Sequence, residues 1–362
     1  MLKRIIAFLE KSPRTKARAI AGALGLDRGE VNRFLHENAD KFEQDDEYQW
    51  SLVAPSCRIE FPGGGWLTAR QFESALIDRA PLTSAHRDVV FALRDGGKPM
   101  LDFIARLLAF CNQLVIAGKT VTLDFGDSSS TLTYLNRVGF FDVLDGSIAV
   151  LPERPSGDLA REFQGNNQGV IEFRLIDPEN PDENIPTLLR NSFVACADKS
   201  YSQAAFTILA ELFGNVRDHS AAGSPGFACL QFYPKAGKIQ AVISDNGLGI
   251  VGTLAPVVPV KYPDVARTMA LAPHPGVALL KEVFSKGELS QNDDDGRGVG
   301  LKRSGDVAKK FKAKISVRQS DFELRIHHDN GAVQFTHRAN LAPLHGTHIC
   351  FEFKLDANVN SA

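Results

Sequence analysis

The sequence predicts a multidomain mixed α/β protein with an N-terminal helical part, a small central α/β unit and a C-terminal α+β sandwich. The chain has 362 residues, more than a single hydrophobic core usually covers. Apolar residues recur at helical spacing near the N-terminus, whereas helix-like and strand-like patterns alternate from residue 168 onward. A polar segment that contains Pro and Gly, residues 153–167, is expected to link the last two parts.

The composition is typical of a globular protein, with 44% hydrophobic and 23% charged residues, and excludes a mainly disordered, collagen-like or coiled-coil chain. The net charge is −2, so a nucleic-acid contact would need a local basic surface. The five cysteines form no Cys-x-x-Cys pair, which argues against a disulfide framework or a local zinc site and favours a reducing, cytoplasmic location. No apolar run of about 18 residues occurs, so no membrane partner is expected.

Residues 1–54 are predicted to form a winged helix-turn-helix. Apolar spacing and alternation predict three short helices and a strand, over 2–11, 15–24, 28–38 and 47–53. Asp27, followed three residues later by Glu30, is suited to cap the third helix. That helix takes the recognition position, with four side chains facing one groove: Arg28, Asn32, Arg33 and His36.

This N-terminal part is similar to the winged helix that binds Z-form nucleic acid, in which an Asn, an aromatic residue four positions later and a wing Trp make the contacts. Asn32, His36 and Trp50 stand at those positions here. The predicted wing also carries four acids that would repel phosphates: Glu43, Asp45, Asp46 and Glu47. Both DNA or RNA binding and protein docking therefore stay open, and Trp50 fits either a contact or the core of the small domain.

Four short motifs occur in one order in residues 168–356. They are Glu211–His219, Asp245–Gly249, Gly296–Leu301 and Gly346–Thr347. Each is weak alone, since Asp-Asn-Gly often marks only a hairpin turn. Their combination and spacing are hard to reach by chance, so we take them together as one candidate site.

The chemistry of these motifs is consistent with nucleotide binding. On a helix predicted over residues 201–220, Glu211, Asn215 and either Asp218 or His219 share one face. An Asn oxygen is a suitable ligand for Mg²⁺, and Asp245 at a strand end can accept a hydrogen bond from an exocyclic amine. The Gly296–Gly300 loop opens into a predicted helix, whose free N–H groups can hold phosphates.

The ordered set resembles the GHKL superfamily, which includes gyrase, the ninety-kilodalton heat-shock chaperone, sensor histidine kinases and the MutL mismatch-repair proteins. The resemblance covers residues 168–356 and implies that the chain binds ATP or ADP with Mg²⁺. It implies that Glu211 activates water as general base, that Asn215 ligates Mg²⁺ and that Asp245, supported by Thr347, reads the adenine amine. The other implied nucleotide-site residues are Asp218, His219, Gly247, Gly249, Gly296, Gly298, Gly300, Leu301 and Gly346. Residues 251–295 would form the lid, with a helix at 275–285.

The central unit, residues 55–152, is expected to contain a helix over 101–115, a strand over 120–125 and a helix over 132–138. Residues 55–95 have too little pattern to assign. The strand runs into Gly126–Ser130 before a helix, which resembles the STAS module of anti-sigma-factor antagonists. Those proteins carry a phosphorylatable Ser at such a corner and have GHKL serine kinases as partners. A Ser-rich helix N-cap explains the same residues without a function.

Three functions are consistent with the motifs. The first is an ATPase, or an ATP-dependent switch, that controls a winged helix bound to nucleic acid or to a protein partner. The second is a serine protein kinase of the anti-sigma-factor type, and the third is a regulator that binds nucleotide without hydrolysing it. The GHKL resemblance also makes an ATP-linked homodimer possible. Residues 357–362 are expected to be a short tail.

Overall fold

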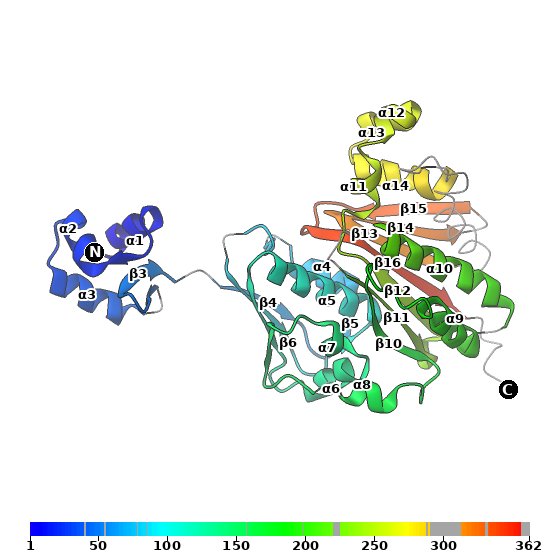
Figure 1. The fold of residues 1–362 in the computed structure, drawn as a ribbon, viewed down its shortest axis with the longest axis horizontal. Helices are drawn as coiled ribbons and strands as arrows, with labels where there is room; N and C mark the ends of the chain where they lie inside the picture. Colours follow the sequence, from blue (N-terminus) through cyan, green and yellow to red (C-terminus); the bar gives the residue numbers. More distant parts are fainter. Residues whose placement is uncertain are drawn as a thin grey trace. The chain divides into compact units, whose positions relative to one another are not determined.

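The computed structural model describes residues 1–355 except 40, 54–55, 78, 85, 157, 198, 220–224, 287–288, 290–312 and 330–331. It has the predicted mixed α/β multidomain architecture, with a small antiparallel sheet, a parallel sheet with helices and a seven-stranded antiparallel sheet (Figure 1). Two compact units are present. One contains residues 1–56 with 85–88, and the other contains the remaining residues from Cys57 onward.

The first unit contains the three predicted helices and a three-stranded sheet. Its elements are α1 (Leu2–Lys11), α2 (Ala17–Leu24), α3 (Arg28–Glu37), β1 (Thr15–Lys16), β2 (Phe42–Gln44) and β3 (Gln49–Leu52), with strand order β1-β3-β2. The predicted cap of α3 is confirmed, since the Asp27 side chain accepts a hydrogen bond from the Glu30 N–H at 3.0 Å. The second helix begins later than expected because Thr15 and Lys16 pair with β3.

A parallel sheet begins the second unit. Its strands are β4 (Cys57–Phe61), β6 (Asp88–Leu93), β8 (Thr120–Asp124) and β9 (Ala149–Leu151), in that order. Its helices are α4 (Ala69–Ala75), α5 (Leu101–Ile116), α6 (Ser129–Arg137) and α7 (Phe140–Val143), and β5 (Trp66–Leu67) pairs with β7 (Lys98–Pro99). The strand and two helices predicted after residue 100 are confirmed, whereas β4, α4 and β6 were not predicted.

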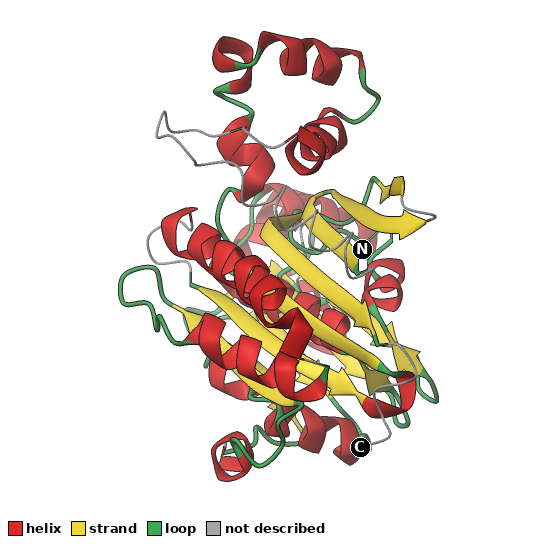
Figure 2. Ribbon diagram, turned by 90° about the vertical axis from the view of Figure 1, so that its right-hand side faces the viewer, coloured by secondary structure: helices red, strands yellow, loops and turns green. Residues whose placement is uncertain are grey.

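The seven-stranded antiparallel sheet has the order β10-β11-β12-β16-β13-β14-β15. Its strands are β10 (Val170–Ile176), β11 (Gly226–Tyr233), β12 (Lys238–Ser244), β13 (Lys314–Ser320), β14 (Phe322–Asp329), β15 (Ala332–Arg338) and β16 (Leu344–Lys354). Each of them lies where a strand-like apolar pattern predicts one, over 168–175, 228–233, 238–244, 313–318, 322–327, 332–336 and 347–353. Helices α9 (Ile185–Cys196) and α10 (Ser202–His219) cross one face of this sheet (Figure 2). Helix α10 was predicted, whereas α9 was not.

Helix α5 lies between the two sheets. Twelve of its sixteen residues are buried, as expected for a helix that is apolar on nearly all sides. One hydrophobic core joins α5 and the parallel sheet to Phe227, Val242 and Leu344 of the antiparallel sheet. A second core, which contains Ala241 and Ile243, fills the opposite face under α9 and α10. The layers are therefore the parallel sheet, α5, the antiparallel sheet and the α9–α10 pair.

The segment predicted as an interdomain linker contains a helix, α8 (Asp158–Phe163). The domain boundaries at 153–167 and 356 stay predictions. What the structure adds is that the two parts on either side of this segment share one core. A linker at residues 153–167 would instead predict a separate core on each side of it.

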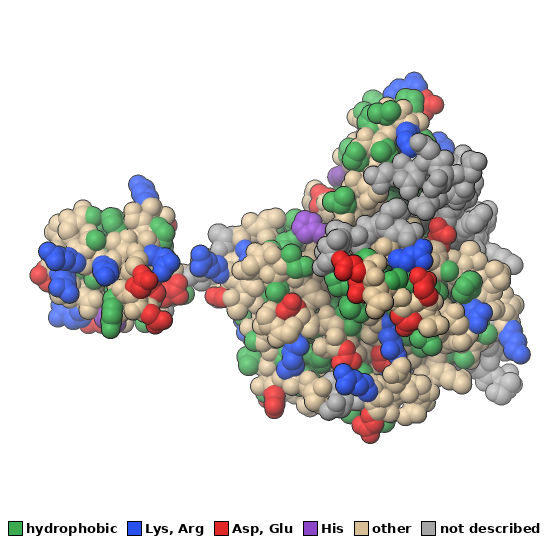
Figure 3. Space-filling model, in the orientation of Figure 1, with side chains coloured by type: hydrophobic (Ala, Val, Ile, Leu, Met, Phe, Trp, Pro, Cys, Tyr) green, Lys and Arg blue, Asp and Glu red, His purple; other side chains and the backbone are tan. Residues whose placement is uncertain are grey.

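Four helices follow β12 in the predicted lid. They are α11 (Gly249–Leu254), α12 (Val258–Lys261), α13 (Pro263–Leu271) and α14 (Pro275–Lys286), the last of which was predicted. They share a small core that includes Leu254 and Leu279. Helices α12 and α13 project from the sheet (Figure 1), and hydrophobic side chains gather on their visible surface (Figure 3). Val260 and Leu271 there are 84% and 88% exposed.

Within the described part of the chain, no helix has the length and apolar character needed to cross a membrane.

Candidate functional site

Two of the four motifs are fully described. The Asp245–Gly249 and Gly346–Thr347 motifs are described completely, and Glu211–His219 is described except for the side chains of Asp218 and His219, which end α10. The third motif, with Gly296, Gly298, Gly300 and Leu301, lies outside the described residues. The described part of the candidate site therefore consists of α10, the loop after β12 and the start of β16.

Helix α10 carries Glu211 and Asn215 one turn apart. Leu212 and Val216 are buried against the sheet, whereas Glu211 and Asn215 are half-buried. Among the described residues neither of these two side chains has a hydrogen-bond or ion-pair partner. A carboxylate and a carboxamide oxygen on one helix face thus stay available to a ligand.

Val216 brings this part of α10 close to the loop after β12. A Cβ added at Gly226 would lie 2.5 Å from Cγ1 of Val216, 2.4 Å from the carbonyl oxygen of Ser244 and 3.4 Å from Cα of Asp245. Only glycine leaves room for these approaches. The turn of α10 that carries Asn215 therefore lies beside the strand end that carries Asp245.

The second and fourth motifs meet although about 100 residues separate them in sequence. Strands β12 and β16 are antiparallel, with Ser244 opposite His348. Just past this pair, the Asp245 N–H donates to the carbonyl oxygen of Thr347 at 2.9 Å, and the Thr347 N–H donates to Oδ2 of Asp245 at 3.1 Å. The Gly247 N–H donates to Oδ1 of Asp245 at 2.8 Å. Three N–H groups thereby fix the loop and the direction of its carboxylate.

Two glycines permit this close approach. Gly346 has φ +84°, and a Cβ there would lie 2.0 Å from the carbonyl oxygen of Asp245. Gly249 has φ +71°, and a Cβ there would lie 2.9 Å from the carbonyl oxygen of Gly346. Both the backbone conformation and the space exclude any larger residue.

Thr347 is tied to a residue that the sequence did not single out. Its Oγ1 accepts hydrogen bonds from Nε2 of Gln319 at 2.8 Å and from the Ile250 N–H at 3.2 Å. Oε1 of Gln319, on β13, accepts from the Val251 N–H at 3.0 Å. The buried Gln319 amide thus joins β13 and β16 to the first turn of α11.

Burial raises the pKa of Asp245 to about 6, although the hydrogen bonds from Gly247 and Thr347 lower it. At pH 7 roughly nine in ten of these carboxyl groups are ionised. The carboxylate keeps lone pairs beyond those used by the two N–H donors, so it can accept a further hydrogen bond. Asp245 forms no ion pair with any described residue, and a carboxylate in a site with a raised pKa is typical of functional sites.

A second amide reaches this loop from α5. Nε2 of Gln113 donates to Oδ1 of Asn246 and to the carbonyl oxygen of His345, each at 2.9 Å. Oε1 of Gln113 accepts from the His345 N–H at 2.8 Å. The Asn246 side chain in turn donates to the carbonyl oxygen of Pro225 at 3.1 Å. Sequence reasoning assigned α5 only an apolar role, because a single Gln in an apolar helix carries no signal.

Four charged side chains form a second buried cluster between α4, α5 and the sheet. Glu73, Arg106, Arg318 and Glu323 are each at most 4% exposed. Glu73 accepts from Arg106 at 2.5 Å and from Nε of Arg318 at 2.9 Å, and Arg106 also pairs with Glu323. Burial opposes ionisation of Glu323, but Arg106 and Arg325 hold the pKa of this carboxyl well below its usual range. Within this cluster every charge has an opposite neighbour.

The candidate nucleic-acid face lies on α3. Arg28, Arg33 and His36 are exposed and Asn32 is half-buried, whereas Val31 and Leu35 are buried in the small core. This is the arrangement that the helical spacing predicted. It leaves the basic side chains free to meet phosphates.

Trp50 belongs to the core, because it is only 2% exposed. The His36 ring lies against it edge to face, with centroids 4.8 Å apart. Of the wing acids, Asp45 has a structural role. Its Oδ1 accepts from the N–H groups of Gln49 and Glu47, which lowers its pKa, and it pairs with Arg14.

The Ser-rich corner of the central unit also has a structural explanation. Ser128 is fully buried, and its Oγ donates to Oγ1 of Thr131 at 2.9 Å. Oγ1 of Thr131 donates to the carbonyl oxygen of Gly97 at 3.0 Å. Ser129 and Ser130 are exposed at the start of α6.

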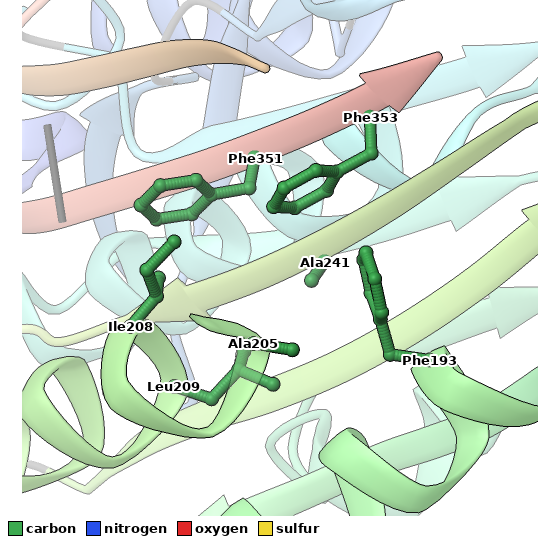
Figure 4. A pocket seen from close by; sticks show the side chains of 7 residues that line it. All are labelled: Phe193, Ala205, Ile208, Leu209, Ala241, Phe351 and Phe353. Carbon is green, nitrogen blue, oxygen red and sulfur yellow. The ribbon is translucent and has the colours of Figure 1, made fainter. Parts of the chain in front are cut away.

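One small cavity lies beneath α10, in the second core (Figure 4). It is lined by Phe193, Ala205, Ile208, Leu209, Ala241, Phe351 and Phe353. Its volume, about 10 Å³, is at the limit of what one water molecule needs. With no polar lining atom it is a packing gap and not a ligand site.

Comparison with known proteins identifies no function for the chain. No protein-family model matches the chain, and no curated protein matches its sequence.

Proposed function

We propose that this chain is an ATP-binding protein of the GHKL type, in which residues 168–356 bind Mg²⁺-ATP and the nucleotide state controls the winged helix. The observation that carries the proposal is the meeting of the Asp245–Gly249 loop with Gly346–Thr347. This meeting leaves a half-buried carboxylate with two glycines against it. Such an arrangement suits a flat base with an exocyclic amine, because the carboxylate accepts its hydrogen bond and the glycines allow close approach.

The residues on α10 fit a magnesium ion. Glu211 and Asn215 carry side-chain oxygens that could ligate a metal, and neither side chain has a partner among the described residues. Mg²⁺ prefers oxygen ligands, and it keeps several waters and binds phosphates. No group of three or more His, Cys, Asp or Glu side chains able to hold a metal is found among the described residues. Asn215 would hold the ion, and bound Mg²⁺ would neutralise phosphate charge. Glu211 would act as general base toward water.

No described contact favours the serine kinase over the ATPase. Ser128, at the STAS-like corner, uses its buried hydroxyl within the fold, which removes the obvious acceptor in this chain. The exposed Ser129 and Ser130 remain open to modification. Incubation with labelled ATP, followed by mass spectrometry for phosphoserine on this chain or on a co-purified partner, distinguishes the two functions, since an ATPase releases phosphate and leaves both proteins unlabelled.

Isothermal titration of the full chain with a nonhydrolysable ATP analogue and Mg²⁺ tests the proposal. We expect binding, which Asn215→Ala abolishes in its Mg²⁺-dependent part. Gln203→Ala removes an exposed amide from the same helix and should change nothing. Glu211→Ala should keep binding and lose phosphate release. A folded wild-type chain that binds no adenine nucleotide would refute the proposal.

A further inference from the structure

Helix α5 carries two buried polar side chains, Arg106 and Gln113, seven residues apart and hence on one face of the helix. Both reach the antiparallel sheet on the face opposite to α9 and α10. Arg106 enters the buried ion cluster, and Gln113 contacts the two loops of the candidate nucleotide site. The helix is thus fixed to the sheet at two points, and one of them is at the site.

All of the hydrogen-bonding capacity of the Gln113 N–H₂ group is used at the site. One hydrogen meets Asn246, the other meets His345, and the amide oxygen accepts from His345. Asn246 follows Asp245 directly, and His345 precedes Gly346. A single buried amide therefore joins the two segments that hold the Asp245 carboxylate, although it belongs to neither.

We propose that Gln113 is a positioning residue for adenine recognition, through which the parallel-sheet half of the unit controls the base specificity of the nucleotide site. This inference rests on the proposed function. Loss of the amide releases Asn246 and His345 from each other, so the N–H groups of Gly247 and Thr347 then hold the carboxylate without this support and fix its direction less tightly. The described hydrogen bonds of the Gln113 side chain reach Asn246 and His345 and not Glu211 or Asn215 on α10, so we expect the effect to fall on the base.

The preceding residue provides a matched control. Nδ2 of Asn112 donates to the carbonyl oxygen of Val143 at 3.1 Å, and its Oδ1 accepts from the Asp145 N–H at 3.0 Å. Asn112 is thus an amide on the same helix that bonds only within the parallel-sheet half. Asn112→Ala should lower the melting temperature much as Gln113→Ala does, without altering the nucleotide loops.

The test compares ADP with IDP, which lacks the exocyclic amine, by isothermal titration of full-length protein with Mg²⁺. We expect the wild type to prefer ADP, Gln113→Ala to lower this preference about tenfold, and Asn112→Ala to keep it within about twofold. Gln113→Asn, which keeps the amide on a shorter arm, should give an intermediate loss and serves if the alanine variant does not fold.

The outcomes separate the two proposals. A folded Gln113 variant that keeps the wild-type ADP preference overturns the positioning role while the proposed function stands. Equal loss of preference in the Asn112 and Gln113 variants also overturns it, since the effect would then follow stability. A wild type that binds neither nucleotide refutes the proposed function itself.

Discussion

Two carboxylates, the buried Glu323 and the half-buried Asp245, are held in opposite ways. Glu323 lies between Arg106 and Arg325, and these cations keep its pKa far below the ordinary range. Asp245 forms no ion pair among the described residues and is held by hydrogen bonds from Gly247 and Thr347, and burial raises its pKa to about 6. The first charge is matched within the fold, so it stabilises the joint between α5 and the sheet. The second is kept at a cost in stability, as expected where a ligand supplies the missing partner.

The largest effect on stability should come from the buried cluster of Glu73, Arg106, Arg318 and Glu323, which we call the matched cluster. Glu73→Ala leaves Arg106 and Arg318 buried beside each other with one carboxylate fewer, and we expect a loss of about 3–5 kcal/mol in the free energy of unfolding, measured with denaturant. Asp264→Ala is the control, because Asp264 and Arg267 form an exposed pair and its removal should cost below about 0.5 kcal/mol. Similar losses in both variants would show that the matched cluster does not stabilise the contact between α5 and the antiparallel sheet.

Nucleotide binding should lose strength in acid because of Asp245. Protonation of a group with a pKa of about 6 leaves about a quarter of it ionised at pH 5.5, so ADP affinity should fall roughly fourfold between pH 7.5 and 5.5 beyond the titration of ADP itself. The folded-state pKa lies above the usual 3.8, so ionised Asp245 lowers stability above pH 6, and this cost is relieved as pH falls from 7 toward 4. Asp245→Asn should bind more weakly and show neither dependence. A variant with the wild-type pH profile would exclude Asp245 as its source.

The smallest effect is expected at the winged helix, because the charges that would contact nucleic acid there are exposed on α3. Fluorescence anisotropy with mixed duplex DNA and RNA should show weak, salt-sensitive binding by the full chain. Changing both Arg28 and Arg33 to Ala should reduce the log–log salt slope on duplex DNA by about 1.8. Arg70 and Arg161, two exposed arginines of the other unit, are the charge-matched control pair. Equal binding by both double variants would favour protein docking by α3.

Strong periodicity made much of the fold predictable. The alternating strands of the antiparallel sheet and the helices α1, α3, α5 and α10 have apolar patterns that local sequence specifies. Strands β4 and β6 were not predicted, because each is a short apolar run beside segments that contain Pro and Gly. The shared core around α5 could not be inferred, since a helix apolar on nearly all sides does not say which two layers cover it.

The candidate site was predictable only where a motif is contiguous. Asp245, Gly249, Gly346 and Thr347 stand in such motifs, and the strand pairing brings them together. Gln113 and Gln319 are single amides that act across long sequence separations, so no local spacing marks them. The same is true of the pair between Arg106 and Glu323, which are 217 residues apart.

Hydrogen exchange of the full chain, read by mass spectrometry with and without Mg²⁺-ADP, tests the central claim most directly. Peptides covering residues 245–254 and 344–349 should gain protection, because the ligand adds a hydrogen bond to the Asp245 carboxylate. Peptides from α4 and β14, which carry Glu73 and Glu323 of the matched cluster, should stay unchanged and serve as the internal control. Protection that appears only in other segments, or not at all at saturating ADP, would contradict the assignment of this loop as the nucleotide site.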